Sequence, residues 1–323
     1  MFSRETLHLI ILPTENCNFR CVYCYERFVK GKMSDGVLRA VLLFLNKMSE
    51  VYKRIHLSFF GGEPLLAYDV ILKVLEHMRG LRERKGIDYD ADMTTNGYLL
   101  TPERFARLVE LGVKGYQITF DGYRDFHDRV RITVGGTKTF DRILNNLREM
   151  KRTNYDFNVL LRLHVHRENV ESLKRLIDLL SQEFGDDRRF RYFIRSVSRL
   201  GGENDEKVDP ALDSQVIEVY KYAKSKLRNV SLLTFGRPIG NVGLAYKLAC
   251  YAANPNSLVI RMDGKVNKCT VYFYDPLNEV GYLDEEGNLH VDGSKLYLWT
   301  RGVITGNPEE LFCPARGLLR GRR

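Results

Sequence analysis

Extended apolar segments alternate with helical ones over the first 197 residues of this 323-residue chain. Strands are predicted where apolar residues run together or alternate with polar ones. On that criterion they cover residues 7–12, 54–60, 90–96, 115–120, 158–166 and 188–197. Successive parallel strands need crossover helices, so six strand–helix repeats predict a parallel sheet covered by helices. We expect an α/β fold built on a partial (β/α)6 TIM-like barrel.

Capping residues indicate where the intervening helices begin and end. Thr101 can cap a helix whose first position is Pro102, and Gly112 lies where that helix should stop. Ser34 can open an earlier helix, and Thr139 is predicted to cap a later one. These signals support the helical half of the repeat.

The strand spanning residues 158–166 separates polar from apolar side chains, because successive residues of a strand point to opposite faces. Leu161, Leu163 and Val165 share the face that helices should cover. We predict a polar barrel interior, since the same alternation turns the following residues inward: Asp92, Thr94, Asn96, Gln117, Thr119, Asp121, Arg162, His164, His166, Arg191 and Arg195.

Three unusual segments directly follow the first three strands. They are CNFRCVYC at residues 17–24, GGEP at 61–64 and TNG at 95–97. In a parallel barrel, reactive groups gather on the loops after the carboxyl ends of the strands, so these segments should share one rim. Each also has a simpler interpretation: GGEP and TNG are turn sequences, and the three cysteines could bind zinc together with His56.

Composition narrows the class of protein. The chain is 44% hydrophobic, yet its longest apolar runs are far shorter than the roughly 20 residues of a membrane-spanning helix, and no signal peptide is evident. We expect a cytoplasmic protein without membrane contact, in which the six cysteines are metal ligands or catalytic groups rather than disulfides. The net charge of +9 is dispersed, and without a nucleic-acid-binding motif a nucleic acid partner is not expected.

With these motifs the chain resembles the radical S-adenosylmethionine (SAM) enzymes. The resemblance implies that Cys17, Cys21 and Cys24, spaced CX3CX2C, hold three irons of a 4Fe-4S cluster. The open fourth iron then binds the amino and carboxylate groups of SAM.

The resemblance also implies SAM-binding residues at other motif positions. Tyr23, just before the last cysteine, lies in the family near the adenine. Gly61, Gly62 and Glu63 match the GGE segment that meets the methionine amino group. Arg162 is a candidate partner for the methionine carboxylate, since a guanidinium pairs with a carboxylate through two hydrogen bonds. Further candidates facing ribose or substrate are Thr94, Asn96, Gln117 and Thr119.

The segment DGYRDFHDRVR, residues 121–131, resembles the SPASM or twitch group, whose members carry auxiliary clusters. Asp121 and His127 are candidate catalytic residues that orient substrate at the end of the fourth strand. Alternatively, the two side chains make hydrogen bonds in a turn or a helix cap, an interpretation that the sequence supports equally well.

The resemblance also implies an auxiliary 4Fe-4S cluster on Cys250, Cys269 and Cys313, with an Asp263-Gly264 hairpin turn between the first two. The family usually adds a fourth cysteine close to the third, and here Arg316 stands there instead. Three alternatives remain: an open fourth iron, completion by His290 or an aspartate, or three buried thiols that bind no metal. We expect the barrel over 1–208, a bridging helical segment over 209–235 and a twitch/SPASM-like domain over 236–323.

The implied chemistry is reductive cleavage of SAM to a 5'-deoxyadenosyl radical, which takes a hydrogen atom from the substrate. We favour a peptide or protein substrate, modified by a thioether or carbon–carbon crosslink or by side-chain oxidation. A separate protein, or the barrel itself, would bind the leader peptide, because the first strand starts close to residue 1. A flavodoxin-type or ferredoxin-type reductant is expected. The alternatives are a twitch-type dehydrogenase of a small-molecule alcohol and a non-catalytic iron-sulfur electron carrier.

Overall fold

The computed structural model describes residues 4–232 and 249–319. They divide into two compact units, of which the first comprises residues 1–15, 30–91 and 244–323 and the second residues 16–29 and 92–243. Strand β3 (Asp88–Thr94) passes from the first unit into the second. The three-part division predicted from the sequence stays a prediction, and its boundary at residues 235 and 236 lies outside the described residues.

The first unit combines a parallel core with antiparallel C-terminal strands, hydrogen-bonded in the order β11-β10-β9-β8-β1-β2-β3. Strand β1 pairs in parallel with β2 and with β8, and β8 to β11 pair antiparallel. Its strands are β1 (Thr6–Ile11), β2 (Arg54–Phe59), β8 (Ser257–Ile260), β9 (Lys265–Asn267), β10 (Glu279–Leu283) and β11 (Leu289–Val291). Its helices are α1 (Asp35–Met48), η1 (Pro64–Ala67), α2 (Tyr68–Lys85), η3 (Tyr251–Ala253), α8 (Gly293–Thr305), α9 (Pro308–Phe312) and α10 (Pro314–Leu319).

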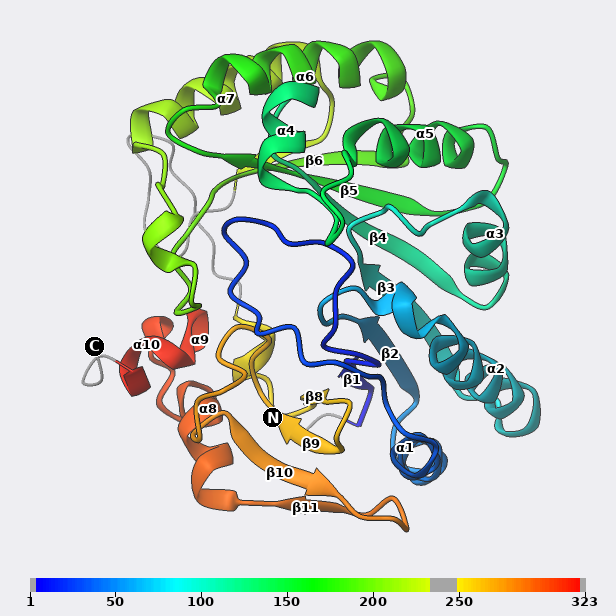
Figure 1. Ribbon diagram of the computed structural model, residues 1–323. Helices are drawn as coiled ribbons and strands as arrows, with labels where there is room; N and C mark the ends of the chain where they lie inside the picture. The colour runs from blue at the N-terminus through cyan, green and yellow to red at the C-terminus, as the bar shows by residue number, and fades with distance from the viewer. Residues whose placement is uncertain (1–3, 233–248, 320–323) are drawn as a thin grey trace. The chain divides into compact units, whose positions relative to one another are not determined.

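The second unit is an all-parallel sheet, hydrogen-bonded from the end of β3 in the order β4-β5-β6-β7. Helices α5, α6 and α7 lie along one face of these strands (Figure 1). The strands are β4 (Val113–Phe120), β5 (Asn158–Val165), β6 (Phe190–Ser196) and β7 (Val230–Leu232). The helices are α3 (Pro102–Glu110), α4 (Arg124–Val130), α5 (Phe140–Lys151), α6 (Val170–Phe184), η2 (Asp205–Lys207) and α7 (Asp213–Lys226).

Apolar burial follows the predicted alternation. Leu161, Leu163 and Val165 of β5 are fully buried beneath the helices of their unit. The register of β4 on β5 sets Thr119 opposite Arg162, so polar side chains share the other face. Every predicted strand is found at its expected place, and none of the described helices is both long and apolar enough to cross a bilayer.

Two local predictions are wrong. Thr139 makes no capping bond at α5, because its hydroxyl donates to the Arg131 carbonyl, while Asp128 Oδ1 accepts from the backbone N–H groups of Thr139 and Phe140. Arg191 is exposed rather than inward, since it lies near the beginning of β6 where water reaches it. Thr101 and Ser34 cap α3 and α1 as predicted.

Candidate active site

The cysteine-bearing loop of the second unit is held in place by backbone pairing with the last residue of α4 and the segment after it. Phe19 forms a bridge with Thr133, and the Val134 N–H donates to Asn18. The Arg20 and Val22 N–H groups donate to carbonyls in the same segment, at 2.9 and 3.1 Å. A loop without regular structure thus gains the hydrogen bonds of a strand pair, which fixes the backbone of Cys17, Cys21 and Cys24.

Two thiols of this loop, those of Cys21 and Cys24, have raised pKa values. Burial raises the pKa of Cys21, partly offset by the Arg131 cation. Burial, with the charges of Glu26 and Cys21, raises the pKa of Cys24 to about 12. The Phe19 N–H points at the Cys17 sulfur, 3.4 Å away. Three thiols on one pinned loop, with N–H donors to sulfur, fit an iron-sulfur cluster, and iron binding at them releases protons.

Asp121 is the centre of a buried hydrogen-bond network in the second unit. The side chain is 0% exposed, and Tyr23 donates its hydroxyl proton to Oδ2 at 2.7 Å. His164 Nδ1 and His166 Nε2 lie 3.2 and 2.8 Å from Oδ1. Burial alone would raise the pKa of Asp121, but the bonds from both histidines and the Arg131 cation hold it well below its usual value. Asp121 is therefore an anion at neutral pH.

Two arginines, the buried Arg131 and the partly buried Arg162, lie near Tyr23 of the cysteine loop. Arg131 donates to the Tyr23 hydroxyl at 2.6 Å, and its Nε lies 3.6 Å from Asp121 Oδ2. Arg162 donates to Thr119 Oγ1 at 3.0 Å, and burial lowers its pKa while the Tyr23 charge opposes that shift. The sequence patterns indicated Arg162 but not Arg131, although Arg131 is the cation that most lowers the pKa of Cys21. The segment that contains it was noted, yet nothing in the sequence placed its last residue beside the loop.

His127 contacts the backbone of Asp121 rather than its carboxylate. The ring is fully buried against Phe120 and Phe140. Its Nδ1 accepts from the Asp121 N–H at 3.4 Å, and its Nε2 lies 3.2 Å from Thr139 Oγ1. Burial lowers the pKa of His127 to about 3, so the ring is neutral. This arrangement favours the turn-stabilising role over contact with a substrate.

The remaining candidates of the second unit lie on the adjacent strands β3 and β4 or just after β3. Gln117 donates to Thr94 Oγ1 at 3.2 Å. Asn96 donates to the Asn18 side chain at 2.8 Å, and its amide nitrogen is 4.0 Å from the Cys17 sulfur. Asn96 therefore links the end of β3 to the cysteine loop.

In the first unit, the GGE segment turns sharply after β2. Gly61 has a φ of +117°, and a Cβ there would meet the Thr14 carbonyl oxygen at 2.2 Å. Glu63 is fully buried, and its Oε1 accepts from the Leu65 N–H at 3.0 Å at the start of η1. Only glycine permits this backbone approach at residue 61.

The other three cysteines gather in the first unit. The Cys250 N–H donates to the Leu311 carbonyl at 2.8 Å, which brings η3 against the chain just before Cys313. Burial, with the charges of Cys269 and Cys313, raises the pKa of Cys250 to about 11. Each thiol is thus within electrostatic reach of the others, as ligands of one cluster must be.

Buried side chains shape the backbone around Cys269. Asn278 Oδ1 accepts from the Lys268 and Cys269 N–H groups at 3.0 and 2.8 Å, and its amide donates to the Cys269 carbonyl at 2.8 Å. The Val271 N–H points at the Cys269 sulfur at 3.4 Å. The Tyr251 hydroxyl lies 2.7 Å from Thr270 Oγ1. Neither Asn278 nor Tyr251 stood out in the sequence, because their partners become neighbours only in the fold.

The alternative metal ligands considered from the sequence have other partners. His290 is half exposed on β11, where it stacks on Tyr282 and bonds to Asp284 at 2.7 Å. His56 lies 3.1 Å from Asp90. Within residues 4–232 and 249–319, no three His, Cys, Asp or Glu side chains converge on a single ion. A four-iron cluster imposes no such convergence, since each thiolate binds a different iron.

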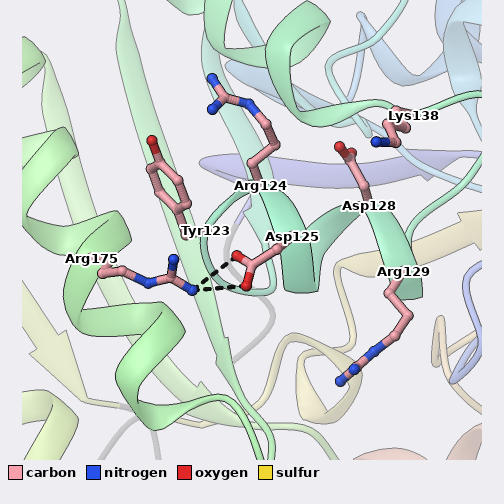
Figure 2. Close-up of a pocket in the computed structure, with 7 residues that line it drawn as sticks. All are labelled: Tyr123, Arg124, Asp125, Asp128, Arg129, Lys138 and Arg175. Carbon is pink, nitrogen blue, oxygen red and sulfur yellow. Dashed lines mark hydrogen bonds and ion pairs between the residues drawn. The ribbon is translucent and has the colours of Figure 1, made fainter.

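Two cavities open on the second unit around α4. One, of about 550 Å³, is lined by Arg124, Arg129 and Arg175, and each of these arginines pairs with a carboxylate, as Figure 2 shows for Arg175 and Asp125. The other, of about 260 Å³, is lined by Val22 of the cysteine loop and by His166. His166 therefore joins the buried Asp121 to a cavity beside the loop.

The comparisons with known proteins identify the family. The radical SAM superfamily model matches residues 11–180, more than half of the chain. The chain belongs to the radical SAM superfamily. The cofactors of that family are a 4Fe-4S cluster and SAM, and an auxiliary cluster is typical of SPASM-type members.

Several relatives span most of the chain. The cysteine-type anaerobic sulfatase-maturating enzyme of Clostridium novyi (strain NT) is 24% identical over 303 residues, covering 87% of this chain and 78% of that protein. The GTP 3',8-cyclase of Clostridium perfringens (strain SM101 / Type A) is 22% identical, covering 84% and 83%.

Solved structures show the same fold. Native anSMEcpe with bound AdoMet and Cp18Cys peptide has a TM-score of 0.68 at 19% identity, covering 90% of this chain and 80% of that one. Streptococcus suis SuiB bound to precursor peptide SuiA has a TM-score of 0.60 at 13% identity, covering 95% and 67%. These matches confirm the predicted fold class, an α/β fold with a parallel core and antiparallel C-terminal strands.

Proposed function

We propose that this radical SAM enzyme modifies a peptide or protein substrate. The observation that carries the proposal is the similarity to a sulfatase-maturating enzyme over 87% of the chain. A structure of similar fold holds a precursor peptide. Sulfatase maturation and precursor-peptide binding belong to those proteins, and their common substrate class suggests the class for this one.

Residues of the second unit would hold the first cluster and part of the cofactor. Cys17, Cys21 and Cys24 are the cluster ligands in this proposal, and SAM bound there supplies a 5'-deoxyadenosyl radical. The Tyr23 ring, fixed by its bond to Asp121, would lie against the adenine. Arg162, partly buried and bonded to Thr119, would meet the cofactor carboxylate.

Asp121 acts in this proposal as a positioning residue. It already accepts hydrogen bonds from Tyr23, His164 and His166, so few of its lone pairs remain for a substrate. Its charge holds both the loop tyrosine and the histidine that lines the smaller cavity. His127 supports the turn after β4.

Residues of the first unit complete the proposed set. Gly61, Gly62 and Glu63 would meet the cofactor amino group, and Cys250, Cys269 and Cys313 would hold the auxiliary cluster. The proposal includes a flavodoxin-type or ferredoxin-type reductant and a leader peptide bound by this chain or by a separate protein. We also propose that the reaction takes place in the cytoplasm.

Anaerobic turnover tests the proposal. The protein is reconstituted with iron and sulfide, given dithionite and SAM, and assayed for 5'-deoxyadenosine by mass spectrometry against a C17A/C21A/C24A control. Peptides from short reading frames beside the gene are then added. We expect cleavage only with the intact loop, and a peptide mass change that depends on SAM. A loaded cluster that never cleaves SAM would instead indicate an electron carrier.

A small-molecule substrate is the alternative, supported by the GTP 3',8-cyclase similarity over 84% of the chain. Parallel reactions with GTP, with candidate alcohols and with peptides separate the two. The substrate class that accelerates 5'-deoxyadenosine formation and is itself consumed decides between them.

A further inference from the structure

The smaller of the two cavities beside α4 reaches the cysteine loop. Val22, which lies between Cys21 and Cys24, lines this cavity together with Phe126 and Val130. The Val22 N–H donates to the Val130 carbonyl at 3.1 Å, so the loop forms part of the cavity wall. The three apolar side chains therefore lie directly beside two of the proposed ligands of the first cluster.

A chain of hydrogen bonds joins the rim of this cavity to the last cysteine of the loop. Lys207 lines the cavity and donates to Asn204 Oδ1 at 3.0 Å. The Asn204 side-chain amide donates in turn to the Cys24 carbonyl at 3.1 Å. The cavity thus touches the loop backbone at Val22 and is connected to it again at Cys24.

Cations outnumber carboxylates around both cavities, which share Arg129. Figure 2 shows four of the cations around α4. Of the carboxylates, Asp128 faces inward, since its Oδ1 accepts from the backbone N–H groups of Thr139 and Phe140. The α4 surface is defined here as the apolar wall of the smaller cavity and the six cations Arg124, Arg129, Lys138, Arg167, Arg175 and Lys207.

The cations of the α4 surface are available to a partner. Arg129 pairs with Glu168 at 3.2 Å, but the two side chains are 62% and 69% exposed. Exposed ion pairs contribute little to stability, so carboxylates of another protein can replace such a partner at small cost. Lys138 and Lys207 are exposed as well, and no carboxylate of the described residues forms an ion pair with either.

We propose that the α4 surface is the docking site of an acidic one-electron carrier protein, which reduces the cluster held by Cys17, Cys21 and Cys24. The inference rests on the first cluster and the reductant included in the proposed function. One electron passes from the reduced flavin or iron-sulfur centre of the carrier to the cluster, so the carrier is oxidised and the cluster reduced. No bond forms or breaks in this step, and no proton moves.

Two physical requirements of such a step are met at the α4 surface. Electron transfer slows steeply with distance, so the carrier has to dock beside the cluster, and Val22 brings the cysteine loop to this surface. Opposite charges speed the encounter of two proteins, and six cations favour an acidic partner. Complexes of electron-transfer proteins are small, so a modest surface is sufficient.

An acidic peptide is a less suitable occupant of the same surface. The smaller cavity has a volume of about 260 Å³. Sites that enclose a small molecule have volumes of roughly 300–1,000 Å³. A shallow apolar hollow with a cationic rim fits the surface of a folded protein better than an enclosed substrate group.

The test compares charge-reversal variants of the full-length protein. K138E/K207E changes two cations of the α4 surface, and K138E changes only the one outside the chain of bonds to Cys24. K221E/K224E is the matched control, because Lys221 and Lys224 are exposed lysines of α7 that line neither cavity. The probes are a purified bacterial flavodoxin with its NADPH-dependent reductase and a purified acidic ferredoxin.

Docking is measured without turnover. Biolayer interferometry gives the Kd of each oxidised carrier for the reconstituted protein, at low and at high salt. Reduction of the first cluster by the reduced carrier is followed by electron paramagnetic resonance in a C250A/C269A/C313A background. SAM cleavage driven by dithionite, which needs no docking site, is the control for an intact cluster.

We expect K138E/K207E to raise the Kd of the carrier about tenfold and to slow cluster reduction to a similar degree. K221E/K224E should stay within about twofold of the parent, and dithionite-driven cleavage should be unchanged in all variants. High salt should weaken binding to the parent more than to K138E/K207E, because salt screens exposed charges. If K138E/K207E loses iron, K138E carries the test, with a smaller effect in the same direction.

The outcomes separate this inference from the proposed function. A parent protein that dithionite cannot drive to cleave SAM would overturn the proposed function itself. Normal cleavage with dithionite, together with equal carrier affinity in the parent and in K138E/K207E, would overturn only the docking site. An equal loss in K221E/K224E would show a general charge effect. Weaker binding of an acidic peptide, with carrier affinity unchanged, would assign the surface to the peptide and contradict the inference.

Discussion

At the scale of single residues, the second unit buries ionisable groups in fixed protonation states. Asp121 is held as an anion by its histidine and arginine neighbours, and His127 is held neutral by burial. Each state is set by surroundings that the unfolded chain lacks, so each makes stability depend on pH.

The buried His127 should make the protein less stable as pH falls. Its pKa of about 3 in the folded state lies below the roughly 6.5 of an unfolded histidine, so only the unfolded chain takes up the proton between those values. Proton uptake by His127 in the unfolded chain should therefore lower the free energy of unfolding by about 1 kcal/mol as the pH falls from 7.0 to 5.5. Urea unfolding of the cluster-free protein and of H127N at both pH values measures this. An equal pH effect in the two proteins would contradict the assignment.

Arg261 and Glu15 form a buried ion pair in the first unit, with two hydrogen bonds of 2.8 and 2.7 Å. Removing one partner leaves the other charge buried and alone, so R261M should lower the unfolding free energy by about 3–5 kcal/mol. The double variant E15M/R261M should lose less than the sum of the single variants. Additive losses in a double-mutant cycle would show that the two side chains do not stabilise each other.

At the scale of elements, short loops with unusual backbone carry the candidate site. The cysteine loop gains order from backbone bonds to residues 130–134, and the GGE turn depends on a glycine. The geometry of both loops comes from contacts between residues that are far apart in sequence.

The turn at Gly61 should not tolerate a side chain. G61A should destabilise the protein by more than G31A, because both glycines have positive φ values, +117° and +98°, but only Gly61 faces a backbone oxygen at 2.2 Å. A gap of at least about 1 kcal/mol is expected in urea unfolding. SAM binding by equilibrium dialysis should weaken in G61A and stay near normal in G31A. If G61A and G31A lost similar amounts of stability and SAM affinity, the predicted clash between a Cβ at residue 61 and the Thr14 carbonyl oxygen would be wrong.

At the scale of the whole molecule, the two cysteine triads belong to different units. Cys17, Cys21 and Cys24 lie in the second, and Cys250, Cys269 and Cys313 in the first. Each triad is fixed by hydrogen bonds within its own unit, so each should assemble its cluster without the other.

Iron content tests this independence. C17A/C21A/C24A should keep about four irons and four sulfides per chain, and C250A/C269A/C313A should keep about the same number. Iron and acid-labile sulfide assays after anaerobic reconstitution measure both. Loss of all iron from either variant would show that the triads depend on each other.

Much of the fold follows from patterns local in the chain. Alternating side chains predicted the six strands, and Thr101 and Ser34 predicted two helix starts correctly. The α5 cap could not be predicted in this way, because Asp128 is eleven residues before the N–H of Thr139 that it binds. Capping rules based on neighbouring residues predict caps such as Thr101 and Ser34, and they miss a cap that a side chain supplies from the other end of a loop.

The sequence by itself determined the strand and helix order, the family and the two groups of three cysteines, because each is a matter of residue type and spacing along the chain. Only the tertiary structure decided that Arg131 bonds to Tyr23 and that Asp121 holds Tyr23 and His166. The physical reason is that charges and hydrogen bonds act through space over a few ångströms, and residues that distant in sequence become neighbours only when the chain folds.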